Sequence, residues 1–340
     1  MENAIDGFER SFYHSFPRKL PSETPELVIT KGLEILKGVK NIGMVLAPEV
    51  VEWGIPQVDS TTKVIRNRQT RICFTELSQS ELSGHAKSFG PFSLEFPIQV
   101  LRQFGILPVI YVPQMVKGDR LLSSVGPVIV WMFENARHTL DLLDQLSKLS
   151  DPRSALELAR RTNPEATHVD PNYVLHLQNN NEDKAIVQRF EVKASIVRGI
   201  LDYLNYKTAP FDLMRGAIYA AQNLFYPTDD QFNDKLLSYY RQREWRIIPG
   251  ATVEGKTNTR MATSVEKEFL LGLDHRFWSR EIVDDKGSFR RIDEAQVIDE
   301  FQGKHISEFI GRVIAPLGAY DQAREVFGDR VGVPPEMTRR

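Results

Sequence analysis

The hydrophobic periodicity of this chain changes along its length, and the order of the changes constrains the fold more than any other feature. Up to about residue 120, short runs rich in β-branched and aromatic residues predict strands. From about 121 to 240 apolar residues recur at helical spacing, and after 241 the pattern returns to strand and then helix. We therefore predict an α+β fold with a mixed or antiparallel sheet, divided into a strand-rich core (1–120), a helical insertion (121–240) and a return to the core (241–340).

Individual segments follow the same division. Strands are expected in SFYHSF, TRICFTEL, GPFSLEF, ILPVIYVP and REWRII. ILPVIYVP is apolar throughout, which favours a position inside a sheet. Helices are expected in PSETPELVITKGLEILKGVKNIG, VWMFENARHTLDLLDQLSKL, AIVQRFEVKASIVRGILDYL, the stretch from Leu213 to Tyr240, and around HISEFIGRVIAPLGAYDQAREVF. The polar stretch from Thr162 to Asp183 is expected to be an exposed loop.

Composition excludes few classes of function, but it favours a location inside the cell. A hydrophobic content of 41% and a charged content of 26% are ordinary for a soluble globular protein. The formal net charge of -2 does not indicate nucleic-acid binding, although a local basic face stays open. A single cysteine, Cys73, fits a reducing interior. The N-terminus lacks the apolar core of a secretory signal, and the run GPVIVWMF is shorter than the ~20 residues of a membrane span. We expect a cytoplasmic protein without a membrane partner.

No local pattern supports metal or triad chemistry. The chain has no P-loop, GxGxxG, HExxH, GxSxG or EF-hand motif. FEVK (Phe190–Lys193) contains the ExK half of a metal-dependent nuclease motif, which normally lies on a strand beside an acidic partner. Helical periodicity in this segment favours a solvated helix face instead. No metal is therefore predicted.

Glu244, in REWRII, is the best candidate for a functional side chain. In a strand, Trp245 and Ile247 share one face, and Glu244 and Arg246 share the other. A surface salt bridge between Glu244 and Arg246 would contribute only ~0–1 kcal/mol. Two interpretations follow, an ion cluster at the sheet edge and a carboxylate presented to a ligand in a cleft.

Three other side chains have a structural and a functional interpretation. His14 lies on a short aromatic strand and is expected to be structural when taken alone. Cys73 is most simply a small core residue. His85, in SELSGHAKSFG, is expected in a loop, where a functional role is open.

The segments LEILKGVKNIGMVLAPE, TRICFTELSQSELSGHAKSFGPFSLEF, LPVIYVP and REWRII together resemble the AbiGi-type abortive phage-resistance proteins. That family has F-T-(D/E)-L, then a histidine, then (Y/F)-G-x-(F/Y), then a strand with P-V-(I/L)-Y and a distal E-W-R. The matching positions are Phe74, Thr75, Glu76, Leu77, His85, Phe89, Gly90, Pro108, Val109, Tyr111, Glu244, Trp245 and Arg246. The resemblance covers most of the first 115 residues and the segment around Glu244. It implies an antitoxin of a phage-exclusion system.

A second resemblance concerns chemistry. YHSF followed by ILKGVKNIG resembles the opening of ADP-ribosyltransferase toxins that modify nucleic acid, which also carry a late strand glutamate. This resemblance implies an ADP-ribosyltransferase-like fold, NAD as substrate and no metal. The implied catalytic residues are Glu244, on a ribose hydroxyl, and His14, on the adenosine ribose. The implied cofactor-binding residues are Tyr13 or Phe74, stacked on nicotinamide, Arg71 or Arg246, at the pyrophosphate, and His85.

The resemblances leave two hypotheses of different classes. The first is a phage-defence effector that acts on NAD, with or without a nucleic-acid acceptor. The second is a non-catalytic antitoxin or sensor that binds a cognate toxin or a phage protein, in which Glu244 and Arg246 fix internal structure. A cleft that brings His14, Phe74 and Glu244 together would favour the enzyme. Dispersed positions, or a Glu244–Arg246 pair buried under the insertion, would favour the binding protein.

Overall fold

The computed structural model describes residues 10–18, 23–56, 62–113, 120–150, 153, 156–157, 160–161, 163–165, 172–179, 186–208, 211–228, 243–249, 252–253, 256–285 and 287–334. The chain forms two compact units, one of residues 1–130 and 220–340 and the other of residues 131–219. These divisions fall inside helices α4 and α7, whereas the sequence predicted boundaries near 120 and 240. Residues 220–228 therefore belong with the sheet.

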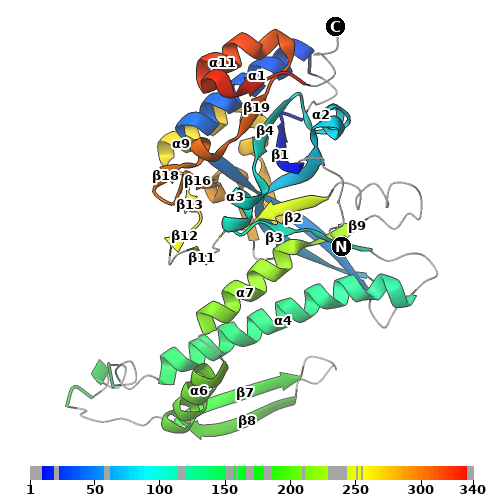
Figure 1. Cartoon of the computed structure of the whole chain (residues 1–340). Helices are drawn as coiled ribbons and strands as arrows, with labels where there is room; N and C mark the ends of the chain where they lie inside the picture. The colour runs from blue at the N-terminus through cyan, green and yellow to red at the C-terminus, as the bar shows by residue number, and fades with distance from the viewer. Residues whose placement is uncertain are drawn as a thin grey trace, which may run out of the picture. The chain divides into compact units, whose positions relative to one another are not determined.

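A 10-stranded sheet forms the centre of the larger unit (Figure 1). The strand order is β13-β16-β2-β3-β1-β4-β19-β20, and β10 pairs with β3 and β5. Among the described strands of this sheet only β19 and β20 pair in parallel, so the sheet is mixed and the predicted α+β class is confirmed. The strands are β1 (Arg10–Phe16), β2 (Met44–Pro56), β3 (Thr62–Ser78), β4 (Phe92–Phe96), β5 (Leu107–Pro108), β10 (Glu244–Ile247), β13 (Arg260–Met261), β16 (Gln296–Ile298), β19 (Arg312–Ile314) and β20 (Val331–Gly332).

Two-stranded pairs and short helices complete this unit. The pairs are β6 (Ile110–Pro113) with β9 (Phe225–Thr228), β11 (Thr252–Val253) with β12 (Lys256–Thr257), β14 (Glu281–Asp284) with β15 (Gly287–Arg290), and β17 (Glu300–Phe301) with β18 (Lys304–His305). The α-helices are α1 (Pro25–Asn41), α2 (Leu82–Phe89), α3 (Ile98–Gln103), α9 (Ser264–Leu273), α10 (His275–Trp278) and α11 (Tyr320–Phe327). The 3-10 helices are η1 (Gln79–Glu81), η2 (Arg291–Glu294), η3 (Ile306–Phe309), η4 (Leu317–Ala319) and η5 (Gly328–Arg330).

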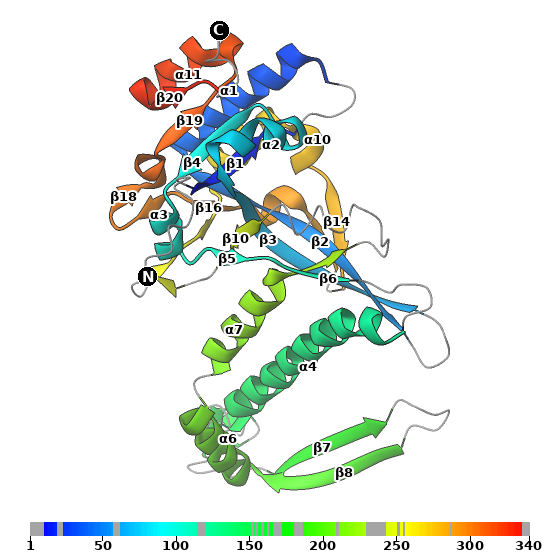
Figure 2. The same cartoon turned by 45° about the vertical axis from the view of Figure 1, so that its right-hand side comes forward.

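Strand alternation gives the sheet two chemically different faces. We call one the core face; it carries Phe12, His14, Phe16, Ile72, Phe74, Leu94, Phe96, Trp245 and Ile247. We call the other the polar face; it carries Ser15, Gln69, Arg71, Cys73, Thr75, Ser93, Glu95, Glu244 and Arg246. Helices α1 and α11 lie side by side and bury Leu36 and Phe327 in the cluster of the core face (Figures 1 and 2). The predicted division of β10 into an apolar and a charged face is confirmed.

Helix α1 begins and packs as its sequence predicts. The Thr24 hydroxyl caps the helix by accepting a hydrogen bond from the Leu27 amide, and Pro25 occupies the first turn. Its buried face includes Gly32, where an added Cβ would lie 2.1 Å from a ring carbon of Phe92. The close approach of helix and sheet at this point therefore requires glycine.

Gly32→Ala is expected to destabilise the larger unit by roughly 1–2 kcal/mol, because overpacking outweighs the gain in helix propensity. The matched control is Gly272→Ala in α9, where nothing lies within 4 Å of an added Cβ. This control should be neutral or stabilising by up to ~1 kcal/mol. Urea unfolding followed by circular dichroism measures both changes. Equal stability of the two variants would mean that α1 and Phe92 do not approach this closely.

The smaller unit contains helices and a β-hairpin. Helix α4 (Arg120–Ser150) runs into it from the sheet, and it is followed by β7 (Asn172–Asn179), β8 (Ile186–Lys193), α6 (Ala194–Thr208) and α7 (Phe211–Leu224). The helix predicted from 185 begins only at Ala194, because residues 186–193 pair with β7, and β7 itself lies in the predicted loop. FEVK is therefore on a strand, and the helical argument against the nuclease motif was wrong.

Three further predictions on secondary structure need correction. ILPVIYVP is split between β5 and β6, and Leu107 and Ile110 are 39% and 45% exposed, so this run is not a central strand. The predicted C-terminal helix is interrupted by β19, and only Tyr320–Phe327 is α-helical. The helix expected up to Tyr240 ends at Leu224 and is followed by β9; residues 229–240 lie outside the described residues.

Candidate functional site

Two segments that are far apart in the sequence, FTEL with the histidine that follows it and EWR, meet on the polar face of the sheet. In the β3–β10 register, Glu244 lies opposite Thr75 and Arg246 lies opposite Cys73. His85, from α2, reaches the same place, with its Nε2 3.0 Å from the Thr75 hydroxyl. The FTEL segment, the histidine after it and the EWR segment therefore form one continuous cluster, which we call the Glu244 site.

Glu244 is an ionised carboxylate in a partly enclosed position. Its side chain is 15% exposed, and the Nε of Arg246 donates a 2.9 Å hydrogen bond to it. The Tyr111 hydroxyl donates a second hydrogen bond. Burial would raise the pKa of Glu244, but the charge of Arg246 and hydrogen bonds from Cys73, Tyr111 and Arg246 outweigh it and lower the pKa below its ordinary value. The carboxylate is therefore charged at neutral pH and can accept hydrogen bonds from a ligand.

Arg246 is a support for this carboxylate and not a ligand-binding side chain. It is only 1% exposed. Its Nη1 donates to the Asn223 carbonyl at 3.1 Å and to the Gln69 side chain at 3.3 Å. The guanidinium also stacks 4.8 Å from the ring centre of Tyr226, on β9. The pair is thus covered by the β6–β9 ribbon. Of this ribbon only β9 lies within the predicted limits of the insertion, and both strands belong to the larger compact unit.

Arg71 is likewise engaged within the protein. Its guanidinium donates to the side chain of Gln69 and forms an ion pair with Glu49. Its guanidinium carbon lies 5.0 Å from the centre of the Tyr226 ring. A pyrophosphate at this position would have to displace Glu49, whose side chain is 45% exposed.

His85 is a neutral, hydrogen-bonded imidazole at the other end of the Glu244 site. Its Nδ1 lies 3.1 Å from the Ser15 hydroxyl, and its ring stacks on Phe89 with centroids 4.3 Å apart. Burial, with a smaller contribution from His14, lowers the pKa of His85 to about 4. The sequence placed His85 in a loop, but it lies on α2.

This pKa predicts a loss of stability in mild acid. An unfolded histidine, with a pKa of about 6.5, binds more protons than folded His85 between pH 6.5 and pH 4, so stability falls as pH is lowered through this window. His85 alone should lower the free energy of unfolding by roughly 2 kcal/mol between pH 7 and pH 5. His85→Gln should remove that part of the slope in urea titrations. An unchanged slope in His85→Gln would contradict a neutral buried imidazole.

The other residues implied by the resemblance do not face Glu244. His14 and Phe74 lie on the core face, and Phe74 is 1% exposed. Tyr13 is on the polar face but 2% exposed, and it packs with Leu77 in a separate apolar cluster. The sheet therefore separates His14 and Phe74 from Glu244, and the three do not line one cleft. Neither Tyr13 nor Phe74 is accessible for stacking on nicotinamide.

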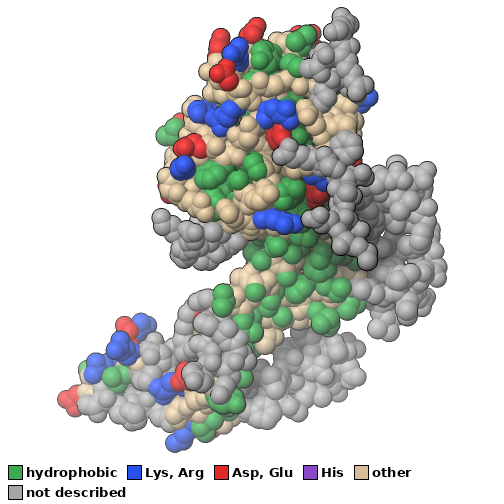
Figure 3. Space-filling view, viewed as in Figure 1, with side chains coloured by type: hydrophobic (Ala, Val, Ile, Leu, Met, Phe, Trp, Pro, Cys, Tyr) green, Lys and Arg blue, Asp and Glu red, His purple; other side chains and the backbone are tan. Residues whose placement is uncertain are grey.

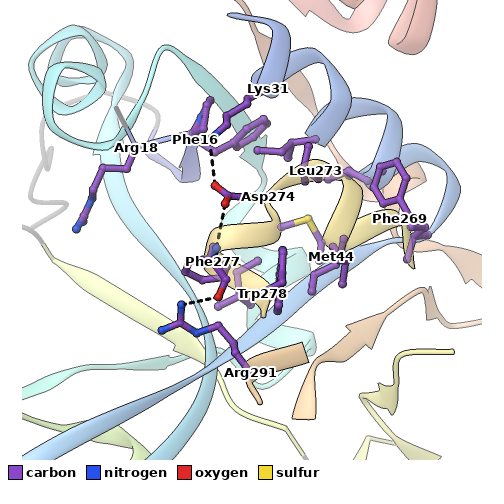
Figure 4. Close-up of a pocket in the computed structure, with 18 of the residues that line it drawn as sticks. Phe16, Arg18, Lys31, Met44, Phe269, Leu273, Asp274, Phe277, Trp278 and Arg291 are labelled. Atoms are coloured by element: carbon purple, nitrogen blue, oxygen red, sulfur yellow. Dashed lines mark hydrogen bonds and ion pairs between the residues drawn. The ribbon is translucent and has the colours of Figure 1, made fainter. Parts of the chain in front are cut away.

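His14 instead lines a cavity on the core face, of about 820 Å³, between α1, the sheet and the α9–α10 segment (Figure 4). Most of its lining is apolar, and Phe16, Leu273 and Trp278 are examples. Sequence reasoning did not find this cavity, because its walls come from residues 14–45, 72 and 269–291 and carry no local motif.

Among the described residues, no group of His, Cys, Asp and Glu has the arrangement of a metal site, and no helix is both long and apolar enough to cross a bilayer. FEVK lies on strand β8, and its described residues belong to no such group of metal ligands. Comparison with protein-family models, with curated proteins and with solved structures finds no match to this chain.

Proposed function

We propose that this chain is a phage-defence protein whose Glu244 site acts on NAD in the manner of an ADP-ribosyltransferase. The observation that carries the proposal is the convergence of Thr75, His85 and Glu244 on one sheet face. These are positions at which the chain resembles abortive phage-resistance proteins. The late strand glutamate is the feature shared with the transferases.

The proposed reaction requires one fixed carboxylate from the protein. The bond between nicotinamide nitrogen and ribose C1′ breaks, and nicotinamide leaves with the bonding electrons. Water, or a nucleophilic atom of a nucleic-acid acceptor, then bonds to C1′ and releases its proton to solvent. The transition state resembles an oxocarbenium ion, so a carboxylate that holds a ribose hydroxyl stabilises the developing positive charge. In this proposal Glu244 has that role, and Arg246 and Tyr111 hold it in place.

The remaining contacts of the proposed site differ from those implied by the resemblance. Thr75 lies opposite Glu244 on the polar face, but its hydroxyl and both ring nitrogens of His85 are hydrogen-bonded within the protein, so a ligand would have to displace these contacts. Arg71 would contact the pyrophosphate only after releasing Glu49. The core-face residues His14 and Phe74 have no part in this site, and by the criterion given for the two hypotheses this dispersal favours the binding protein considered below.

The test is NAD turnover by the purified full chain, with and without added DNA or RNA, beside two variants. Glu244→Gln should reduce turnover at least about 100-fold, because the charge that stabilises the transition state is lost. Glu95→Gln is the matched control, since Glu95 is also an arginine-paired carboxylate on the polar face, bonded to Arg312. It should retain turnover within a few-fold. Absence of turnover in the folded wild-type protein under every condition would reject the enzyme.

The second candidate is a non-catalytic antitoxin or sensor that binds a cognate toxin or phage protein. A row of exposed apolar side chains on α6 favours it: Ile196, Ile200 and Tyr203 are 54%, 55% and 63% exposed and follow helical spacing. Their opposite face, with Val197 and Leu201, is buried. Apolar side chains also gather over α7 in Figure 3, where Leu213 is 65% exposed. Exposed apolar surface of this kind is typical of protein-binding sites.

Plaque assays separate the two candidates. Cells that carry the chain would be challenged with a phage panel, using Glu244→Gln, Ile200→Asp and the control Asp202→Ala, at an exposed polar position of the same helix. Loss of protection in Glu244→Gln alone supports the enzyme. Loss in Ile200→Asp alone, at normal protein levels, supports the binding protein.

A further inference from the structure

The cavity on the core face contains a largely buried arginine that has no ion-pair partner among the described residues. Arg291 lines the cavity and is 8% exposed. Its Nε donates to the Pro48 carbonyl at 3.2 Å and its Nη1 to the Phe277 carbonyl at 3.1 Å. The guanidinium stacks 3.9 Å from the centre of the Phe277 ring. Among the described residues no carboxylate pairs with Arg291, and its Nη2 makes no hydrogen bond.

Burying a cation without an ion-pair partner raises the free energy of the folded state unless an anion binds beside it. Burial lowers the pKa of Arg291; the charge of Glu49 opposes this shift and the charge of Arg280 adds to it. An anionic group in the cavity would supply the missing charge and accept from Nη2. The remaining lining is consistent with this sign, because five cationic side chains (Arg18, Lys31, Arg276, Arg280, Arg291) face two acidic ones (Glu23, Asp274).

The two acids of the lining are already used by Lys31. This lysine on α1 forms ion pairs with Glu23 and with Asp274, and Asp274 caps α10 by accepting from the Phe277 amide at 3.0 Å. Figure 4 shows this chain of contacts from Lys31 through Asp274 and Phe277 to Arg291. The bridge ties α1 to the α9–α10 segment along the cavity, and among the described residues neither acid of the lining forms an ion pair with Arg291.

The rest of the cavity lining is mostly apolar and favours a ligand with an apolar part. The side chains of Phe16, Ile35, Met44, Leu273 and Trp278 form much of the wall. A volume of about 820 Å³ lies in the range of ligand pockets, ~300–1,000 Å³.

His14 is the polar group that the sheet contributes to the cavity. Its Nδ1 donates to the Cys73 carbonyl at 2.8 Å, which leaves Nε2 as an acceptor, and burial lowers its pKa. The imidazole is therefore neutral and adds no second cation next to the apolar wall.

We propose that the core-face cavity binds an amphipathic organic anion, with an acyl or aromatic body between α1 and the α9–α10 segment and its carboxylate on Arg291. This site lies on the opposite side of the sheet from Glu244 and does not depend on the proposed action on NAD. Binding of such an anion would join α1, η2 and α10 through one ligand.

Laurate, 1-dodecanol and dodecylammonium, each below its micellar concentration, are suitable probes because they share one apolar chain and differ in charge. Binding to the full chain would be followed by the fluorescence of Trp278 and its fellow tryptophans and by isothermal titration. Laurate should bind at least tenfold more tightly than dodecanol, and dodecylammonium should bind most weakly. Equal affinity for laurate and dodecanol, or no binding of laurate, would overturn the proposal.

Variants locate the site. Arg291→Gln keeps hydrogen-bond donors but not the charge, and it should make the affinities for laurate and dodecanol equal. Arg276→Gln, at an exposed arginine of the lining, is its matched control and should preserve the preference. Leu273→Trp should fill the cavity and reduce laurate binding at least tenfold. Val265→Trp, on the same helix at a position 76% exposed, should not. Full laurate binding by folded Leu273→Trp, or loss of the preference in Arg276→Gln alone, would place the anion elsewhere.

Discussion

Replacing Arg246 with methionine is expected to lower the free energy of unfolding of the larger unit by about 3–5 kcal/mol. The side chain is 1% exposed, so its removal leaves the Glu244 carboxylate in a partly enclosed site without its ion-pair partner. The Asn223 carbonyl and the Gln69 side chain lose a donor as well. An unpaired charge in such a place costs far more than the pair contributes when intact, which is why this substitution has the largest expected effect on stability.

The control is an arginine that pairs with a carboxylate on the same sheet face but is more exposed. The Arg312 side chain is 35% exposed and pairs with Glu95 at 2.7 Å. Arg312→Met should cost only about 1 kcal/mol, because water replaces part of the lost interaction. Urea unfolding followed by tryptophan fluorescence measures both. The double variant Arg246→Met with Glu244→Leu should recover part of the loss, since it leaves no charge behind. A cost of Arg246→Met no greater than that of Arg312→Met would contradict a buried pair.

Most of what could be predicted about the polar face came from the alternation of side chains along a strand. It placed Trp245 and Ile247 on one side of β10 and Glu244 and Arg246 on the other, and the register confirms this. The same reasoning could not show that β6 and β9 would cover the charged side, because Tyr111 and Tyr226 are brought there by a parallel pairing between distant segments. The ion cluster and the presented carboxylate were therefore both compatible with the sequence.

Local periodicity failed where tertiary pairing decides the conformation. Ile186 and Phe190 have helical spacing with Val197 and Leu201, yet residues 186–193 form a strand because β7 pairs with them along their full length. A short apolar run is compatible with either structure until its partner is known. The cavity on the core face could not be predicted from the sequence for a related reason: only the folded chain shows that Arg291 lines it and has no ion-pair partner among the described residues.

Because His14 and Glu244 are separated, only part of the resemblance to ADP-ribosyltransferase toxins can support a proposed reaction. His14 is on β1 and Glu244 is on β10, and both strands pair with β3. The two side chains are separated because they point to opposite faces of the sheet. The Glu244 site thus contains residues for which the sequence predicted a resemblance to abortive phage-resistance proteins, whereas His14, for which it predicted a resemblance to the transferases, lines the other cavity.

Cys73 should be alkylated by iodoacetamide at pH 8 roughly 10³-fold more slowly in the folded chain than in the unfolded chain. Burial, followed by the negative charge of Glu244, raises the pKa of the Cys73 thiol from 9.0 to about 12. The thiolate is the reacting species, so three pKa units lower its fraction by about that factor. As the single cysteine in the chain, Cys73 allows the rate to be read by intact-mass spectrometry without assignment.

Glu244→Gln tests the electrostatic part of this protection separately from burial. The substitution removes the charge that opposes ionisation of Cys73 but keeps a side chain of similar size, so alkylation should become several-fold faster. Glu95→Gln, which changes a more distant carboxylate of the same face, should leave the rate unchanged. If folded wild-type protein reacts within tenfold of the rate in guanidinium chloride, Cys73 is an accessible thiol. In that case the hydrogen bond between Cys73 and Glu244 would not persist in solution, and the Glu244 site would have to be wider than the cluster described above.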